Sequence, residues 1–260
     1  MQKITIKKIL KKKGKEPITC LTAYSKTTAE ILDRYCDIIL VGDSVGMSLY
    51  GMKTTKEVKI ETMLLHGKTV KRFVKKSLVV FDMPYKTYPN KFIAYKNAKK
   101  VLKLTRCDAI KLEGGKEIIN IIKYLVKKSI PVMGHVGLLP QYSTNFKLKG
   151  KNLSQKKKIL EDAVALSDAG VFAIVIECVV ESLAKKISNT VSVPTIGIGA
   201  SKHCDGQILV LDDIIGLSNF YPRFVKKYSN VKVIIEKAVK KYCEDVKSKK
   251  FPSFQHVYKF

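Results

Sequence analysis

Tryptophan is absent from this chain of 260 residues, and the marks of several common protein classes are missing too. No apolar run reaches the roughly 18–20 residues that a helix needs to cross a membrane. The basic N-terminus, MQKITIKKILKKKGK, lacks the apolar core and small-residue cleavage site of a secretory signal. We therefore expect a cytoplasmic protein with no membrane partner.

Paired cysteines are missing as well. The six cysteines are scattered, and they form no CxxC pair and no Cys/His spacing typical of a zinc site. Cys178 directly follows Glu177 and is a tempting nucleophile, but strand alternation points the two side chains to opposite faces. We expect free buried thiols rather than disulfides, zinc ligands or a catalytic thiol.

Arginine is scarce in a chain whose net charge is +27, since only four of its 49 basic residues are arginine. Proteins that read phosphates or bases usually use arginine for its bidentate fork. Here lysine is spread along almost every expected helix, which indicates a bias in composition. We therefore expect no specific nucleic-acid partner, although a polyanion-binding protein remains the alternative from another functional class.

Segments typical of strands alternate with segments typical of helices along almost the whole chain. The eight strand candidates span residues 18–24, 38–44, 78–84, 109–115, 131–137, 173–179, 193–200 and 207–216. Helical periodicity covers, among others, residues 56–76, 90–104 and 231–247. This alternation predicts parallel strands with right-handed crossovers, in a (β/α)8 TIM barrel or a doubly wound open sheet.

Five consecutive strand candidates each end on one polar or charged residue. These residues are Asp43, Asp82, Glu113, His135 and Glu177. A carboxylate is costly to bury unless it is paired or bound to a metal, so five such placements indicate an active site built from strand ends. The pattern favours the barrel, whose active site lies at the carboxyl ends of its strands. We expect a single barrel domain over residues 1–260, with both termini as appendages.

Three of these residues are hard oxygen donors on neighbouring strands. Asp43, Asp82 and Glu113 have no cysteine companions, so they suit Mg²⁺ or Mn²⁺ better than Zn²⁺. Lys111 lies two residues before Glu113 and therefore faces the same way. It is expected to pair with a charged group, although a Schiff-base lysine in an aldolase remains open.

The other two residues suggest acid–base chemistry opposite the metal. Glu177 follows four apolar residues, which favours a role as general base. His135 lies between glycines that let a ligand approach closely, and either a catalytic role or a role as a hydrogen-bonded core residue remains open. A metal facing a carboxylate base indicates removal of a proton beside a carbonyl, with the metal stabilising the resulting enolate.

Short motifs throughout the chain resemble one family, the ketopantoate (3-methyl-2-oxobutanoate) hydroxymethyltransferases. They occur in the family's order from about Ile4 to Tyr258. The matching segments are LTAY (21–24), LVGDSVGM (40–47), FDMPY (81–85), IKLEGG (110–115), GHVGLLPQ (134–141), IECV (176–179), IGIGA (196–200), CDGQILVLDD (204–213) and PRFVKKY (222–228). Any one of them says little, but together they are specific.

The resemblance implies a barrel of the phosphoenolpyruvate/pyruvate type and transfer of a one-carbon unit from 5,10-methylenetetrahydrofolate to 3-methyl-2-oxobutanoate. The product is 2-dehydropantoate, on the route to pantothenate. The resemblance also implies one Mg²⁺ per subunit and a homo-oligomer, a decamer in the family.

The resemblance also assigns roles to individual residues. Asp43 and Asp82 would bind Mg²⁺, with Glu113 nearby. Four residues would hold the oxo acid, namely Asp43, Ser44, Asp82 and Lys111. His135 would line the pocket. Glu177 would remove the C3 proton. The closest alternative is a Mg²⁺-dependent, enolate-forming lyase or mutase of the same barrel superfamily.

Overall fold

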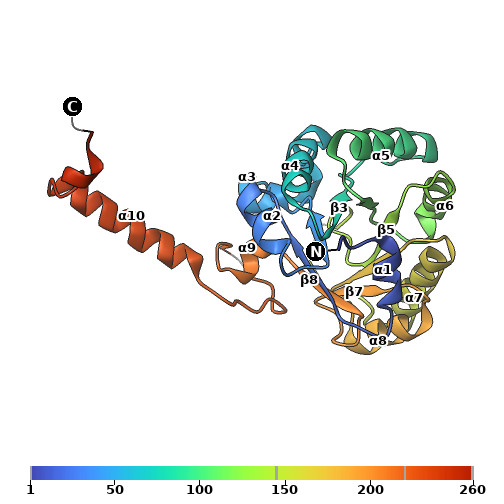
Figure 1. The fold of residues 1–260 in the computed structure, drawn as a ribbon. Coiled ribbons are helices and arrows are strands. Elements are labelled where there is room, and N and C mark those ends of the chain that lie inside the picture. Colours follow the sequence, from blue (N-terminus) through green and yellow to red (C-terminus); the bar gives the residue numbers. More distant parts are fainter. Residues whose placement is uncertain (1, 144–145, 220, 259–260) are drawn as a thin grey trace. The chain divides into compact units, whose positions relative to one another are not determined.

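Eight parallel strands form a closed barrel in the order β1 to β8 in the computed structural model of the protein, which describes residues 2–143, 146–219 and 221–258 (Figure 1). The strands are β1 (Ile18–Thr22), β2 (Ile38–Val41), β3 (Leu78–Asp82), β4 (Ala109–Lys111), β5 (Val132–Gly137), β6 (Ala173–Glu177), β7 (Thr195–Ile198) and β8 (Gly206–Leu209). β1 pairs with β8, which closes the sheet. The predicted barrel is confirmed and the open sheet is excluded.

Every second residue of the strands fills the barrel interior. Ile38 and Leu40 of β2 and Leu78 and Val80 of β3, for example, belong to one buried cluster. Because side chains alternate across a strand, the next inward position on β3 is Asp82. The same two-residue alternation places inward-facing charged or polar residues at the carboxyl ends of β4, β5 and β6, next to the buried apolar side chains of the barrel interior.

The α-helices of the described residues mostly connect successive strands, whereas one precedes β1 and two follow β8. They are α1 (Ile6–Lys11), α2 (Lys26–Leu32), α3 (Val45–Tyr50), α4 (Ile60–Phe73), α5 (Lys91–Thr105), α6 (Ile119–Lys127), α7 (Leu153–Asp168), α8 (Glu181–Thr190), α9 (Leu211–Ile214) and α10 (Val231–Lys247), with 3₁₀ turns at Thr55–Glu57, Lys116–Ile118 and Phe254–His256. Side-chain caps begin several of them. Asn90 accepts hydrogen bonds from the N–H groups of Phe92 and Ile93, for instance, which satisfies the first turn of α5.

Several predicted element bounds are too wide, for example that of the strand expected over residues 109–115, which ends at Lys111. The helix expected over residues 56–76 covers only Ile60–Phe73, because a 3₁₀ turn at Thr55–Glu57 precedes it. The strand expected over residues 207–216 ends at Leu209, and α9 follows directly. The apolar run LVLDDIIG cannot distinguish a strand from a short helix by periodicity alone.

The N-terminal segment closes the floor of the barrel. Ile9 of α1 is fully buried in the same cluster as the inward residues of the strands. Three lysines of the segment each pair with the aspartate that precedes a strand: Lys3 with Asp108, Lys12 with Asp37 and Lys13 with Asp205. The basic terminus therefore serves as a plug at the amino ends of the strands, opposite the ends that carry the polar side chains.

Asp205 gives this floor a measurable dependence on pH. Burial alone raises the pKa of its carboxyl, but the N–H groups of Thr195 and Gly14 and the Lys13 ammonium reverse the effect, so the net pKa lies below the ordinary value. Because the pKa is lowered on folding, the ionised carboxyl stabilises the fold at pH values above the unfolded-state pKa of about 3.9. This stabilisation is lost as the pH falls through the folded-state pKa. We expect Asp205→Asn to lower stability by about 1.5–3 kcal/mol at pH 7.

Urea denaturation at several pH values measures this effect. The difference between the wild-type and Asp205→Asn proteins should begin to shrink below about pH 4, where the carboxyl of the unfolded chain becomes protonated, and should be lost as the pH falls through the lowered pKa of the folded protein. Asp168→Asn is the matched control, because Asp168 is an exposed carboxylate at the end of α7. A difference for Asp205→Asn that stays constant from pH 7 to pH 3 would contradict the expected linkage.

The chain divides into two compact units, residues 1–210 and 211–260. The first contains the whole barrel. In the second, the predicted helix over residues 231–247 is confirmed as α10, and none of its residues is buried. Within the described part of the chain, no helix is both long and apolar enough to span a membrane.

Candidate active site

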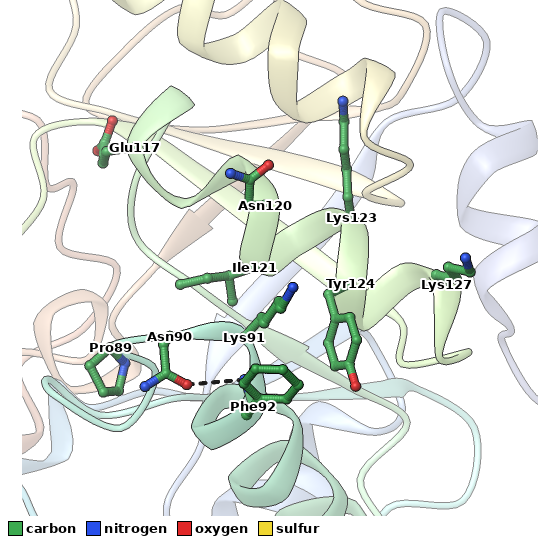
Figure 2. A pocket seen from close by; sticks show the side chains of 10 residues that line it. All are labelled: Pro89, Asn90, Lys91, Phe92, Glu117, Asn120, Ile121, Lys123, Tyr124 and Lys127. Atoms are coloured by element: carbon green, nitrogen blue, oxygen red, sulfur yellow. Dashed lines mark hydrogen bonds between the residues drawn. The ribbon is translucent and has the colours of Figure 1, made fainter.

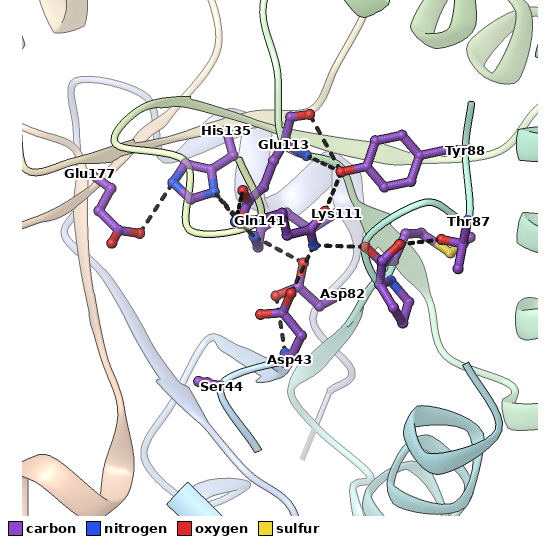
Figure 3. Close-up of polar contacts among 12 residues, drawn as sticks. Asp43, Ser44, Asp82, Thr87, Tyr88, Lys111, Glu113, His135, Gln141 and Glu177 are labelled. Carbon is purple, nitrogen blue, oxygen red and sulfur yellow. Dashed lines mark hydrogen bonds and ion pairs between the residues drawn. The ribbon is translucent and has the colours of Figure 1, made fainter. Parts of the chain in front are cut away.

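Ionisable side chains gather at the carboxyl ends of β2 to β6, and we call them the strand-end cluster (Figure 3). Five members are at most 5% exposed to solvent: Asp43, Asp82, Lys111, Glu113 and His135. The sixth, Glu177, is less buried. Thus the structure brings together all five residues that end the predicted strands, because neighbouring parallel strands end at the same rim.

Lys111 lies between two carboxylates of the cluster. Its Nζ atom is 2.9 Å from Oδ1 of Asp82 and 3.9 Å from Oε1 of Glu113. On the other side of Asp82, Oδ2 accepts a hydrogen bond of 3.3 Å from the backbone N–H of Asp43. One buried cation therefore faces three buried carboxylates, which leaves the site with an excess of negative charge.

The pKa shifts reflect this imbalance. Burial, followed by repulsion from Asp82 and Glu113, raises the pKa of Asp43 well above its ordinary value. Burial also raises the pKa of Asp82, against the attraction of Lys111. For Lys111, burial lowers the pKa, but the neighbouring carboxylates more than reverse this effect. Lys111 is therefore a charged ammonium near pH 7, which argues against its use as a neutral Schiff-base nucleophile.

His135 connects Lys111 with Glu177. Its Nδ1 atom lies 3.2 Å from Nζ of Lys111, and its Nε2 atom lies 3.2 Å from Oε2 of Glu177. An ammonium group can only donate, so in a neutral ring Nδ1 accepts and the proton resides on Nε2, facing Glu177. Nε2 is buried and makes no hydrogen bond of good geometry among the described residues, so the structure shows a close contact of His135 with Glu177 rather than a hydrogen bond.

Glu113 is held on several sides. Burial raises the pKa of its carboxyl, but His135, Lys111 and the backbone N–H of Gln141 outweigh burial and lower the pKa overall. The Gln141 N–H group donates to Oε2 at 3.0 Å. Glu113 is therefore ionised and firmly oriented near pH 7.

Two members of the site were not predicted. Gln141 lies in the turn after β5 and is fully buried, and its side chain donates a hydrogen bond of 2.7 Å to Oδ2 of Asp43. Tyr88 lies in the loop after β3 and donates to Oε1 of Gln141 at 2.5 Å. Neither residue ends a strand, so the strand pattern could not indicate them; Gln141 appeared only as the last letter of GHVGLLPQ.

Ser44 lies beside the cluster. It directly follows Asp43 at the start of α3 and is half-buried. Its Oγ atom is 2.7 Å from the hydroxyl group of Tyr24, in the loop after β1. Ser44 is therefore placed next to Asp43 by the chain and is anchored to the neighbouring loop by its hydroxyl.

The cysteines take no part in the site. All six are free, but Cys178 is only half-buried and Cys243 is exposed, so the expectation of buried thiols is wrong for these two. Burial, followed by the charge of Glu177, raises the pKa of Cys178 to about 11. The thiol is therefore protonated near pH 7 and is a poor nucleophile.

The strand-end cluster offers carboxylate oxygens to a divalent cation. No group of three or more His, Cys, Asp or Glu side chains among the described residues is arranged as a set of metal ligands. Mg²⁺, however, is commonly held by one or two carboxylates, with water and substrate oxygens completing its coordination. Asp43 and Asp82 are adjacent, buried and short of positive charge, so this pair fits such a site.

A surface hollow of about 570 Å³ lies elsewhere, between α5 and α6 (Figure 2). Phe92 and Tyr124 line it, and the ammonium group of Lys91 lies 5.1 Å and 5.8 Å from the centres of these two rings. No member of the strand-end cluster lines this hollow. The candidate active site is therefore the buried cluster.

Comparison with known proteins agrees with the motifs. The family described as ketopantoate hydroxymethyltransferase matches residues 3–254. The chain belongs to this family. It is 58% identical over 255 residues to the 3-methyl-2-oxobutanoate hydroxymethyltransferase of Pelagibacter ubique (strain HTCC1062), covering 97% of this chain and 99% of the relative. It is 48% identical to the protein of the same name from Bartonella quintana (strain Toulouse), covering 100% and 96% of the two chains.

Solved structures share the fold of this family member at low sequence identity. One is a 2,3-dimethylmalate lyase of the PEP mutase/isocitrate lyase superfamily, with a TM-score of 0.64, 11% identity, and coverage of 98% of this chain and 88% of the other. Another is a phosphonopyruvate hydrolase in complex with oxalate and Mg²⁺, with a TM-score of 0.64, 11% identity, and coverage of 98% and 93%. They confirm the predicted (β/α)8 fold.

Proposed function

We propose that this protein transfers a hydroxymethyl group from 5,10-methylenetetrahydrofolate to 3-methyl-2-oxobutanoate and so forms 2-dehydropantoate for pantothenate biosynthesis. Family membership over residues 3–254 and the names of the relatives support this activity. The geometric observation that carries the proposal is the separation of charge within the cluster. Lys111 and the Asp43–Asp82 pair lie on one side of His135, and Glu177 lies on the other.

Asp43 and Asp82 would hold Mg²⁺ in this proposal. When bound, the ion polarises the 2-oxo group of the substrate and stabilises the enolate formed from it. The fit of the carboxylate pair supports this role, and so does the related barrel that holds oxalate, a small dicarboxylate, together with Mg²⁺. Glu113 as a further metal ligand stays a prediction, since Gln141 and Lys111 already engage its carboxylate.

The remaining residues bind the substrate and move the proton. The charged Lys111 would pair with the carboxylate of the oxo acid, beside Asp43 and Ser44. Glu177 would take the proton from C3, and the electrons of the C–H bond would move into the enolate. His135 would keep the Glu177 carboxylate turned toward the pocket. The enolate carbon then attacks the methylene carbon of the folate, and both C–N bonds of that carbon break with their electrons left on the folate nitrogens. One water supplies the hydroxyl group and one of the two protons that release tetrahydrofolate, and the proton taken from C3 is the other. We assign no residues to folate binding.

A turnover assay tests this function. The purified protein is incubated with Mg²⁺, 3-methyl-2-oxobutanoate and 5,10-methylenetetrahydrofolate, and 2-dehydropantoate is measured by mass spectrometry. Formation of the product that stops on addition of EDTA is the expected result. An absence of product with a correctly folded, Mg²⁺-supplied protein would reject the proposal. The alternative lyase or mutase activity has only the shared fold in its support.

We also propose that the enzyme works in the cytoplasm as a homo-oligomer, as the family resemblance implies. Its six free cysteines suit a reducing compartment. α10 exposes apolar side chains that a second copy could cover, namely Ile234, Ile235, Val239, Tyr242 and Val246.

The mass in solution tests the oligomeric state. Light scattering should give a multiple of the 29.2 kDa chain mass, with ten copies if the decamer of the family applies. Replacing Val239 by lysine should lower this mass, because it places a charge among the exposed apolar side chains. A wild-type mass of one chain would contradict the proposal.

A further inference from the structure

Gln141 contacts more of the active site than its place in a turn suggests. Its side chain is fully buried. Four hydrogen bonds, three of the side chain and one of the backbone N–H, connect Gln141 with the surrounding elements. These bonds are Nε2 to Oδ2 of Asp43 (2.7 Å), Nε2 to the carbonyl oxygen of Met83 (2.9 Å), the backbone N–H to Oε2 of Glu113 (3.0 Å), and the Tyr88 hydroxyl to Oε1 (2.5 Å). Gln141, in the turn after β5, thus connects the chain segments at the ends of β2, β3 and β4 (Figure 3).

The partners determine the orientation of the Gln141 amide. The carbonyl oxygen of Met83 can only accept, so the NH₂ group must face it. The second hydrogen of that group then points to Oδ2 of Asp43. The amide oxygen is left to accept the hydrogen bond from Tyr88. A flipped amide would place its oxygen against the carbonyl oxygen of Met83, so only this orientation satisfies every partner.

We propose that Gln141 is a positioning residue that holds Asp43 and Glu113 in fixed orientations and so prepares the carboxylate pair Asp43–Asp82 for a divalent cation. The inference rests on the function proposed above. The hydrogen bond from Gln141 engages one oxygen of Asp43 and leaves the other for a cation. Without it, the Asp43 carboxylate could turn away from Asp82, because like charges in a buried site repel each other.

Replacing Gln141 by methionine tests the inference. Methionine has a similar length and volume but cannot donate to Asp43, while the backbone N–H that binds Glu113 remains. The matched control is Gln155→Met, which removes a glutamine that accepts from the backbone N–H of Gly150 and lies outside the cluster. A second variant, Tyr88→Phe, removes the hydroxyl that donates to the amide of Gln141 at 2.5 Å and that makes longer contacts of 3.4 Å and 3.5 Å with the backbone of Glu113, so it answers the same question if Gln141→Met does not fold.

The readout is the affinity for Mn²⁺, followed by electron paramagnetic resonance in the absence of substrate. We expect Gln141→Met to weaken Mn²⁺ binding by about 10- to 100-fold, the range typical of groups that orient metal ligands. Tyr88→Phe should weaken it less, and Gln155→Met should leave it unchanged. Thermal denaturation without metal is measured in parallel, since a purely structural role would lower the melting temperature without changing the affinity.

Two outcomes would overturn the inference. One is an unchanged Mn²⁺ affinity in folded Gln141→Met or, where that variant does not fold, in Tyr88→Phe. The other is a wild-type protein that binds no Mn²⁺. The proposed function is decided separately by the turnover assay, because the Mn²⁺ titration requires neither the oxo acid nor the folate. A wild-type protein that binds Mn²⁺ but forms no 2-dehydropantoate would reject the function alone.

Discussion

Replacing Glu177 by glutamine is expected to abolish exchange of the C3 proton of 3-methyl-2-oxobutanoate with solvent. Glutamine keeps the shape of the side chain but cannot accept the proton, and loss of a general base typically costs about 10²- to 10⁴-fold in rate. Binding of the oxo acid should remain nearly normal, because the charges that hold it lie around Lys111. Proton NMR in D₂O with Mg²⁺ measures the exchange, and calorimetry measures the binding.

Glu181→Gln is the control for this experiment. Glu181 lies in the first turn of α8, where its Oε1 atom accepts a hydrogen bond of 2.9 Å from Ser201, and it does not belong to the strand-end cluster. The control protein should exchange the C3 proton at the wild-type rate. Near-normal exchange in Glu177→Gln would show that another group is the base.

Replacing Lys111 by methionine is expected to destabilise the barrel and to prevent binding of the oxo acid. The change removes the cation 2.9 Å from Asp82 and leaves the buried carboxylates without their partner. Removal of one member of a buried ion pair typically costs about 3–5 kcal/mol. Because the pKa of Lys111 is raised, this loss should be present throughout the neutral range. Urea denaturation and calorimetry measure the two effects.

Lys100→Met controls for the loss of a lysine. Its ammonium group is half-exposed and lies 3.9 Å from Glu61, so the change should cost at most about 1 kcal/mol. Added Mg²⁺ should restore part of the stability of Lys111→Met, because a bound cation would replace some of the lost charge. An Lys111→Met protein as stable as the control would contradict the assigned charge balance.

The barrel and the members of the strand-end cluster were accessible from the sequence. Every second side chain of a strand faces the barrel interior, so the inward position after Val80 on β3 is Asp82, and the one after Val175 on β6 is Glu177. The alternation of strands and helices then required parallel strands whose carboxyl ends meet. Local patterns were sufficient because the relevant side chains lie on regular strands.

Other parts of the site were not accessible in this way. Gln141 reaches Asp43 from a position 98 residues further along the chain, and it does so from a turn without a periodic pattern. The orientation of His135 toward Glu177 depends on a proton donor from another strand, Lys111. The plug formed by α1 depends on the burial of Ile9 in an N-terminal segment that was expected to be an appendage to the barrel.

The sequence by itself determined the eight-stranded barrel, the rim that carries the chemistry and the family, because periodicity and short motifs are properties of neighbouring residues. Only the tertiary structure decided that Lys111 is held as an ammonium between Asp82 and Glu113, and that Gln141 holds Asp43. The physical reason is that charge state and hydrogen bonding depend on burial and on distances between residues remote in the chain.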